Sequence, residues 1–103
     1  MRNCKNKDEI ESETMVFSAI TINKLGYKYL DKKKSLKAIE IFKLYVEAYP
    51  EDANAYDSLA EAYLSDGDWK MAIRYFLKSL AFDPGNNNAI GHLNHLGVEV
   101  KTW

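Results

Sequence analysis

The chain repeats part of its own pattern at an interval of 34 residues. A fixed period of this size is typical of arrays in which similar units stack on one another. Each unit of such an array buries its apolar face only against its neighbours, so the period constrains the fold more than any single motif does. The matched pairs are Ala19 and Ala53, Leu25 and Leu59, Tyr29 and Tyr63, Ala38 and Ala72, Phe42 and Phe76, and Pro50 and Pro84.

The second copy contains two helical patterns separated by turn-forming residues. Its apolar side chains recur at i, i+3, i+4, i+7 and i+8, which places them on one face of a helix. Ser65–Asp68 and Asp83–Asn86 are rich in residues that end helices, and Pro84 lacks the N–H that a helix interior needs. We therefore expect helices at about 53–66 and 68–82. The first carries Tyr56, Leu59, Ala60, Tyr63 and Leu64, and the second Ala72, Ile73, Phe76, Leu77 and Leu80.

The same reasoning assigns the rest of the chain. A leading helix is expected from about Ser12 to Lys32, with Leu25 on its apolar stripe. A helix capped by Ser35 and ending near Tyr49 should follow, and a last helix should span about 87–96 before an extended tail. The predicted organisation is a flexible terminus at 1–11, a repeat domain at 12–97 and a tail at 98–103. The domain divides into repeats at 19–52 and 53–86 and a capping helix at 87–97.

This pattern resembles the tetratricopeptide repeat, a helix–turn–helix unit of 34 residues. The resemblance implies an all-α fold, a right-handed superhelix or solenoid of two full repeats plus a C-terminal capping helix. The first copy departs from the family pattern at Ile22, at Lys33, where the turn glycine is usual, and at Tyr45. The second copy matches it at Tyr56, Leu59, Ala60, Tyr63, Gly67, Asp68, Ala72, Phe76 and Pro84.

The resemblance also implies a function, because the first helices of such repeats line a concave groove that binds proteins or extended peptides. Asparagine amides suit a peptide backbone, since they both donate and accept hydrogen bonds. Asp57 and Glu61 would favour a basic side chain in the partner. The residues expected to face the groove are Asn23, Tyr27, Leu30, Asn54, Asp57, Ser58, Glu61, Ser65, Asn88, His92 and His95.

Some members of the family hold a C-terminal carboxylate in a clamp of lysines, arginine and asparagines. The matching positions here carry different residues. Asn23 and Asn88 stand at lysine positions, Tyr27 and Ser58 at asparagine positions, and His92 at the arginine position. A receptor of that kind is therefore not expected.

Charge and motif content argue against other classes of function. Nucleic-acid binding normally needs a basic surface, and a net charge of −1 does not indicate one. No apolar run is long enough to span a membrane. His92 and His95 are too few to hold a metal alone. No phosphate-binding loop or nucleophile motif is present, so we expect neither an enzyme nor a cofactor. The charged, non-apolar N-terminal residues suggest a cytoplasmic protein.

Two alternatives to a peptide-binding module remain open. Two repeats and one further helix make a short array, which self-association into a homo-oligomer would complete. The segment Tyr56–Tyr63, together with Phe42–Pro50, also resembles the repeats at the C-terminal end of some bacterial β-lactamase-like serine hydrolases. The chain would then be a detached, non-catalytic appendage of such a protein.

Overall fold

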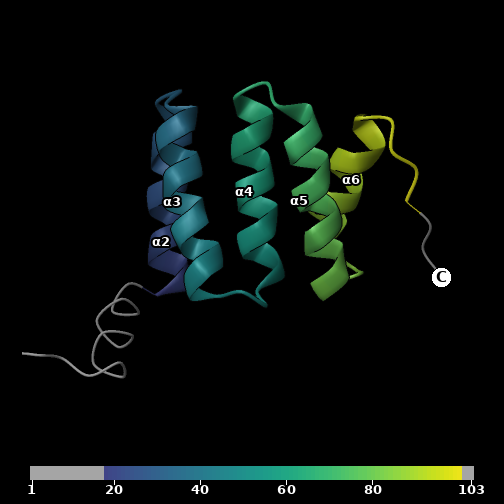
Figure 1. The fold of residues 1–103 in the computed structure, drawn as a ribbon, viewed down its shortest axis with the longest axis horizontal. Coiled ribbons are helices and arrows are strands. Elements are labelled where there is room, and N and C mark those ends of the chain that lie inside the picture. The colour runs from purple at the N-terminus through teal and green to yellow at the C-terminus, as the bar shows by residue number, and fades with distance from the viewer. Residues whose placement is uncertain (1–17, 101–103) are drawn as a thin grey trace, which may run out of the picture.

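The computed structural model describes residues 18–100, in which helices lie side by side in chain order (Figure 1). Two antiparallel pairs, α2–α3 and α4–α5, are followed by α6, so the predicted all-α repeat architecture is confirmed. No strand occurs within residues 18–100. None of the helices in this range is long and apolar enough to cross a bilayer. The helices are α2 (Ala19–Asp31), α3 (Ser35–Ala48), α4 (Ala53–Ser65), α5 (Trp69–Phe82) and α6 (Asn87–His95).

The beginnings of the helices correct two predictions. The start predicted near Ser12 was wrong for α2, because Ser18 is extended and its side chain accepts a hydrogen bond from the backbone N–H of Thr21. Ser35 is the first residue of α3 and does not cap it. Its hydroxyl instead forms a 2.8 Å hydrogen bond with that of Ser65. The predictions for residues 1–11, and for 101–103 of the tail, lie outside the described residues.

The first helix of each unit ends in the same left-handed turn. Gly67 has a φ of 86° after α4, and Gly97 has the same φ after α6. In the first copy Lys33 takes this position with a φ of 61°. After α4 the N–H of Asp68 donates to the carbonyl of Tyr63 at 2.9 Å, the bond that closes a Schellman turn. The repeat therefore imposes this turn even where a lysine occupies the glycine position.

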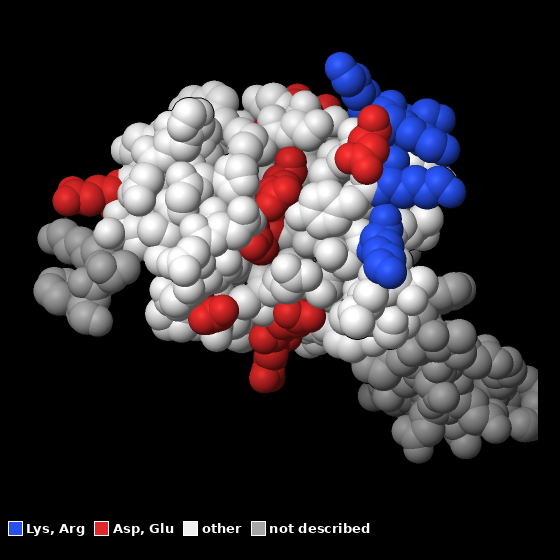
Figure 2. Space-filling view, turned by 180° about the vertical axis from the view of Figure 1, so that it is seen from behind, with Lys and Arg blue, Asp and Glu red and all other residues white. Residues whose placement is uncertain are grey.

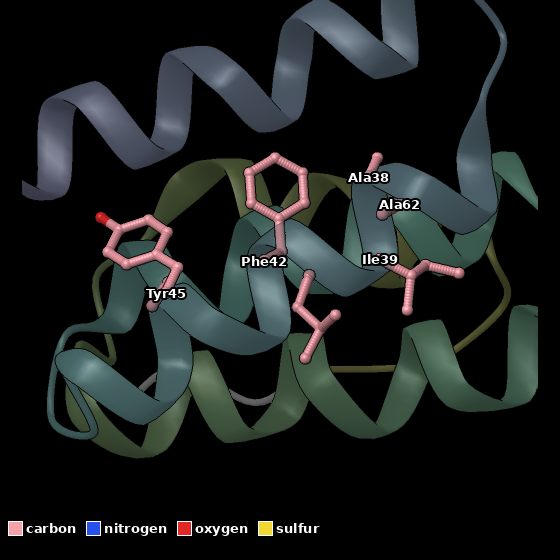
Figure 3. Packing of buried hydrophobic residues seen from close by; sticks show 7 residues of the cluster. Ala38, Ile39, Phe42, Tyr45 and Ala62 are labelled. Carbon is pink, nitrogen blue, oxygen red and sulfur yellow. The ribbon is translucent and has the colours of Figure 1, made fainter. Parts of the chain in front are cut away.

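Small residues at the helix crossings allow the paired helices to approach closely. A Cβ added to Gly26 in α2 would overlap the ring of Phe42 in α3. Ala60 and Ala72 serve the same purpose between α4 and α5, and both are fully buried. Figure 3 shows Phe42 pointing from α3 towards α2, within the first core cluster. That cluster comprises Ala38, Ile39, Phe42, Tyr45, Ala55, Leu59 and Ala62.

Two leucines placed on the apolar stripes are exposed instead. Leu59 is 1% exposed because it packs in the cluster with residues of α3, whereas its counterpart Leu25 is 42% exposed. Among the described residues, no helix precedes α2 to cover that side. Leu77 was also expected to be buried, yet it is 46% exposed.

A second core cluster joins α4, α5 and α6. Val98 and Val100, in the extended segment after α6, pack against it. Tyr63 and Tyr75 contact both clusters, and their rings stack with centroids 5.6 Å apart and planes 3° apart. These two tyrosines therefore connect the cores of the two repeats. The second cluster comprises Ala60, Ala72, Phe76, Ala89 and Leu93.

Candidate functional site

The first helices α2, α4 and α6 form one face of the molecule. Figure 1 shows α2 behind α3 and α6 behind α5, so this face is the one seen in Figure 2. Acidic side chains occupy the middle of that face, and basic side chains gather on the side of α2. The acidic residues of α4 are Asp57 and Glu61. The face therefore carries a charged centre formed by the middle helix of the three.

Helices α2 and α4 are joined at this face by a short hydrogen bond. The hydroxyl of Ser58 donates to Oδ1 of Asn23 at 2.6 Å. The ring of Tyr27 packs edge-on against Phe42 at 5.2 Å, and its hydroxyl interacts with Ser58 and Glu61. Burial raises the pKa of Tyr27, and the hydrogen bond to Glu61 adds to the rise. The tyrosine thus stays a neutral hydrogen-bonding group at ordinary pH.

Helices α4 and α6 are joined by a buried carboxylate and two amides. Asp57 is 5% exposed, and its carboxylate accepts from Nδ2 of Asn88 at 2.8 and 3.0 Å and from Nδ2 of Asn86 at 3.0 Å. The Nδ2 of Asn88 also donates to Glu61 at 2.7 Å. Burial raises the pKa of Asp57, although the two amides oppose this by stabilising the ionised form. The acidic pair therefore holds α6 in place.

His92 completes the contact between α4 and α6. Its imidazole stacks on Phe76, with centroids 4.8 Å apart and planes 13° apart. Its Nε2 lies 3.7 Å from Oε2 of Glu61. The side chains of His92 and Glu61 remain 33% and 24% exposed, so both are accessible to a partner.

The seven residues that converge at this face were all among those predicted from the sequence. We call them the polar cluster: Asn23, Tyr27, Asp57, Ser58, Glu61, Asn88 and His92.

The other four predicted residues lie apart from the polar cluster. Nδ2 of Asn54 donates to the hydroxyl of Tyr45 at 3.1 Å, and Ser65 bonds to Ser35, so both side chains contact α3. Burial raises the pKa of Tyr45 to about 12. The remaining two are Leu30, which packs on the first core cluster, and the exposed His95.

Two residues that the sequence analysis did not select support the polar cluster. Oδ1 of Asn86 accepts from the N–H groups of Asn88 and Ala89, which caps α6. Its Nδ2 bonds both Asp57 and, at 2.9 Å, the hydroxyl of the fully buried Ser79. An asparagine directly before a helix was the available signal, since asparagine is a favoured N-cap.

Within residues 18–100, no three side chains of histidine, cysteine, aspartate or glutamate come together in a way that could hold a metal ion. The polar cluster consists of hydrogen-bonding groups from three helices that are bonded to one another.

Comparison with known proteins identifies the repeat. A family model described as the tetratricopeptide repeat matches residues 55–87. The chain is also 31% identical over 81 residues to the Tetratricopeptide repeat domain-containing protein PYG7, chloroplastic, of Arabidopsis thaliana. This alignment covers 79% of the chain and 27% of the relative, so the chain spans about a quarter of that protein. The chain belongs to the tetratricopeptide repeat family, whose repeats generally mediate protein–protein interaction and are typically non-catalytic.

Proposed function

We propose that the chain is a non-catalytic binding module whose concave face, formed by α2, α4 and α6, takes a protein or an extended peptide. The observation that supports this most is the polar cluster itself. Side chains from three helices that are separated in the sequence converge there, linked by bonds such as those from Ser58 to Asn23 and from Asn88 to Glu61. Such a set of donors and acceptors matches the alternating N–H and C=O groups of an extended backbone.

The members of the polar cluster have different roles in this proposal. Asp57 is buried, and both its oxygens accept from amides of the capping-helix segment, so it fixes α6 and does not contact the partner. Glu61 is partly exposed beside His92 and is the carboxylate available to a basic side chain. Tyr27 of α2 supplies a hydroxyl beside Glu61 and Ser58.

The test is the affinity of an identified protein partner for matched variants. Tyr27→Phe removes the hydroxyl but keeps the ring against Phe42, and Glu61→Gln removes the charge but keeps an acceptor for Asn88. Each is expected to weaken binding roughly tenfold, because each removes a hydrogen bond or ion pair to the partner. Lys43→Ala, on the exposed side of α3, is the control. Unchanged affinity in both variants would remove the concave face as the binding site.

The remaining inferences stay predictions. They are self-association into a homo-oligomer, an origin as the appendage of a bacterial hydrolase, a cytoplasmic location, and a partner that is neither nucleic acid nor membrane.

A further inference from the structure

The outer face of α5 carries large apolar side chains that the repeat does not require. Trp69 and Leu77 are 53% and 46% exposed. One period earlier, on α3, these positions hold Ser35 and Lys43. A side chain needed for packing between repeats recurs at the period, as Phe42 and Phe76 do. The exposed tryptophan and leucine therefore have no role in stacking the array.

The basic residues of α5 also do not recur at the positions 34 residues earlier on α3. Lys70, Arg74 and Lys78 are all exposed. The counterparts of Lys70 and Arg74 on α3 are Leu36 and Glu40. The sequence of α5 contains no aspartate or glutamate. This helix thus has a uniformly positive outer face, whereas α3 has a mixed one.

These residues form two adjacent stripes along α5. Side chains four apart lie on the same side of a helix, so both sets extend over two turns. The apolar stripe is Trp69, Ile73 and Leu77, of which Ile73 is partly buried and also packs on the second core cluster, and the basic stripe is Lys70, Arg74 and Lys78.

Two lysines of the basic stripe lie over aromatic rings. Nζ of Lys70 lies 5.7 Å from the ring centroid of Trp69, and Nζ of Lys78 lies 5.5 Å from that of Tyr56. Among residues 18–100, no carboxylate forms an ion pair with Lys70, Arg74 or Lys78. Its charges are therefore available to a partner.

We propose that the two stripes of α5 form a second interaction surface, which binds an amphipathic protein segment that carries leucine-like and acidic side chains. Charge complementarity selects this partner, because a surface with three cations and no acidic residue repels a basic segment. Tryptophan and arginine are enriched at protein interfaces, and the exposed Leu77 adds apolar area that a partner would bury. Figure 1 shows α5 in front of α6, so this surface faces away from the concave face. The chain would hold two partners at once.

The test uses two synthetic helical peptides of the length of α5, with the same leucine stripe. One peptide has glutamate at every polar position and the other has lysine. The glutamate peptide is expected to bind and to shift the backbone amide NMR signals of α5, whereas the lysine peptide is not. Leu77→Ala and Arg74→Glu should each weaken binding roughly tenfold. Lys43→Ala, which lies one period before Leu77, should leave the dissociation constant unchanged.

A single cooperative thermal transition close to that of the wild type would show that each variant folds. Equal binding of both peptides, or shifts confined to α2, α4 and α6, would overturn the proposal. A concentration-dependent dimer that Leu77→Ala abolishes would assign the surface to a second copy. Binding of phosphatidylserine vesicles that depends on Arg74, without binding of the glutamate peptide, would assign it to a membrane. A failure of the concave face in the Tyr27→Phe and Glu61→Gln test leaves this proposal unaffected.

Discussion

Substituting alanine at two helical glycines separates helix propensity from packing. Gly26 lies in α2 and Gly91 lies in α6, both within helices. Alanine is favoured over glycine in a helix interior by about 1 kcal/mol. A Cβ at Gly91 would meet no atom within 4 Å, so Gly91→Ala should stabilise the fold by about that amount.

The same substitution at Gly26 should have the opposite sign. Its Cβ would lie 2.8 Å from Cδ1 of Phe42 and would overlap the far side of that ring. Carbon atoms in contact normally stand about 3.5–4.0 Å apart. The ring is fully buried and packs against Tyr27, so it has no room to withdraw. Overpacking of this kind costs about 3 kcal/mol, which leaves a net loss of about 2 kcal/mol after the gain in propensity.

The assay is urea denaturation followed by far-UV circular dichroism. Gly26→Ala and Gly91→Ala are expected to differ by about 3 kcal/mol in the free energy of unfolding. In a Phe42→Leu background the cost of Gly26→Ala should disappear, because the smaller side chain vacates the space. A Gly26→Ala variant as stable as the wild type would refute the reasoning. So would a cost that persists when Phe42 is shortened.

Two further predictions concern turns and the buried carboxylate. Lys33→Gly should stabilise the protein by about 1 kcal/mol and Gly67→Ala should destabilise it by a similar amount, because both positions have positive φ; urea denaturation measures both. The raised pKa of Asp57 means that this group's contribution to stability is full at pH values below its ordinary pKa and is lost as the pH rises through its folded pKa. The stability of the wild type relative to Asp57→Asn should therefore fall as the pH rises above about 4, the ordinary pKa of the group, and a difference that grows with pH would contradict the assignment.

Sequence periodicity predicted the helices because the scaffold residues are those that neighbouring units bury. The counterparts Phe42 and Phe76 are both fully buried. Periodicity failed where a residue lacks the neighbour that its counterpart has, as for Leu25. It also failed at Ser18, because a cap depends on one local backbone conformation that the apolar pattern does not report.

The polar cluster was only partly predictable. Counting positions along a helix selects residues near one face, and it selected both Asp57 and Asn88, whose side chains are hydrogen-bonded in the structure. It does not show which of these side chains form hydrogen bonds within the protein. Asn54 turns towards Tyr45, and Asn86 bonds Asp57 from a loop that the helical count does not include. Which side chains of neighbouring helices form hydrogen bonds with each other depends on the distance between the helices, which cannot be read from the sequence alone.

The stacked pair Tyr63 and Tyr75 determines how the array loses its structure. A repeat array in which each unit contacts only its neighbours melts unit by unit unless the interface between units is strong. Here the same two rings belong to both cores, so neither core can open without exposing them. The two repeats should therefore unfold together in a single cooperative transition. Among residues 18–100, Val98 and Val100 pack on the second core only, so we expect amide hydrogen exchange to be faster in this segment than in the helices that share Tyr63 and Tyr75.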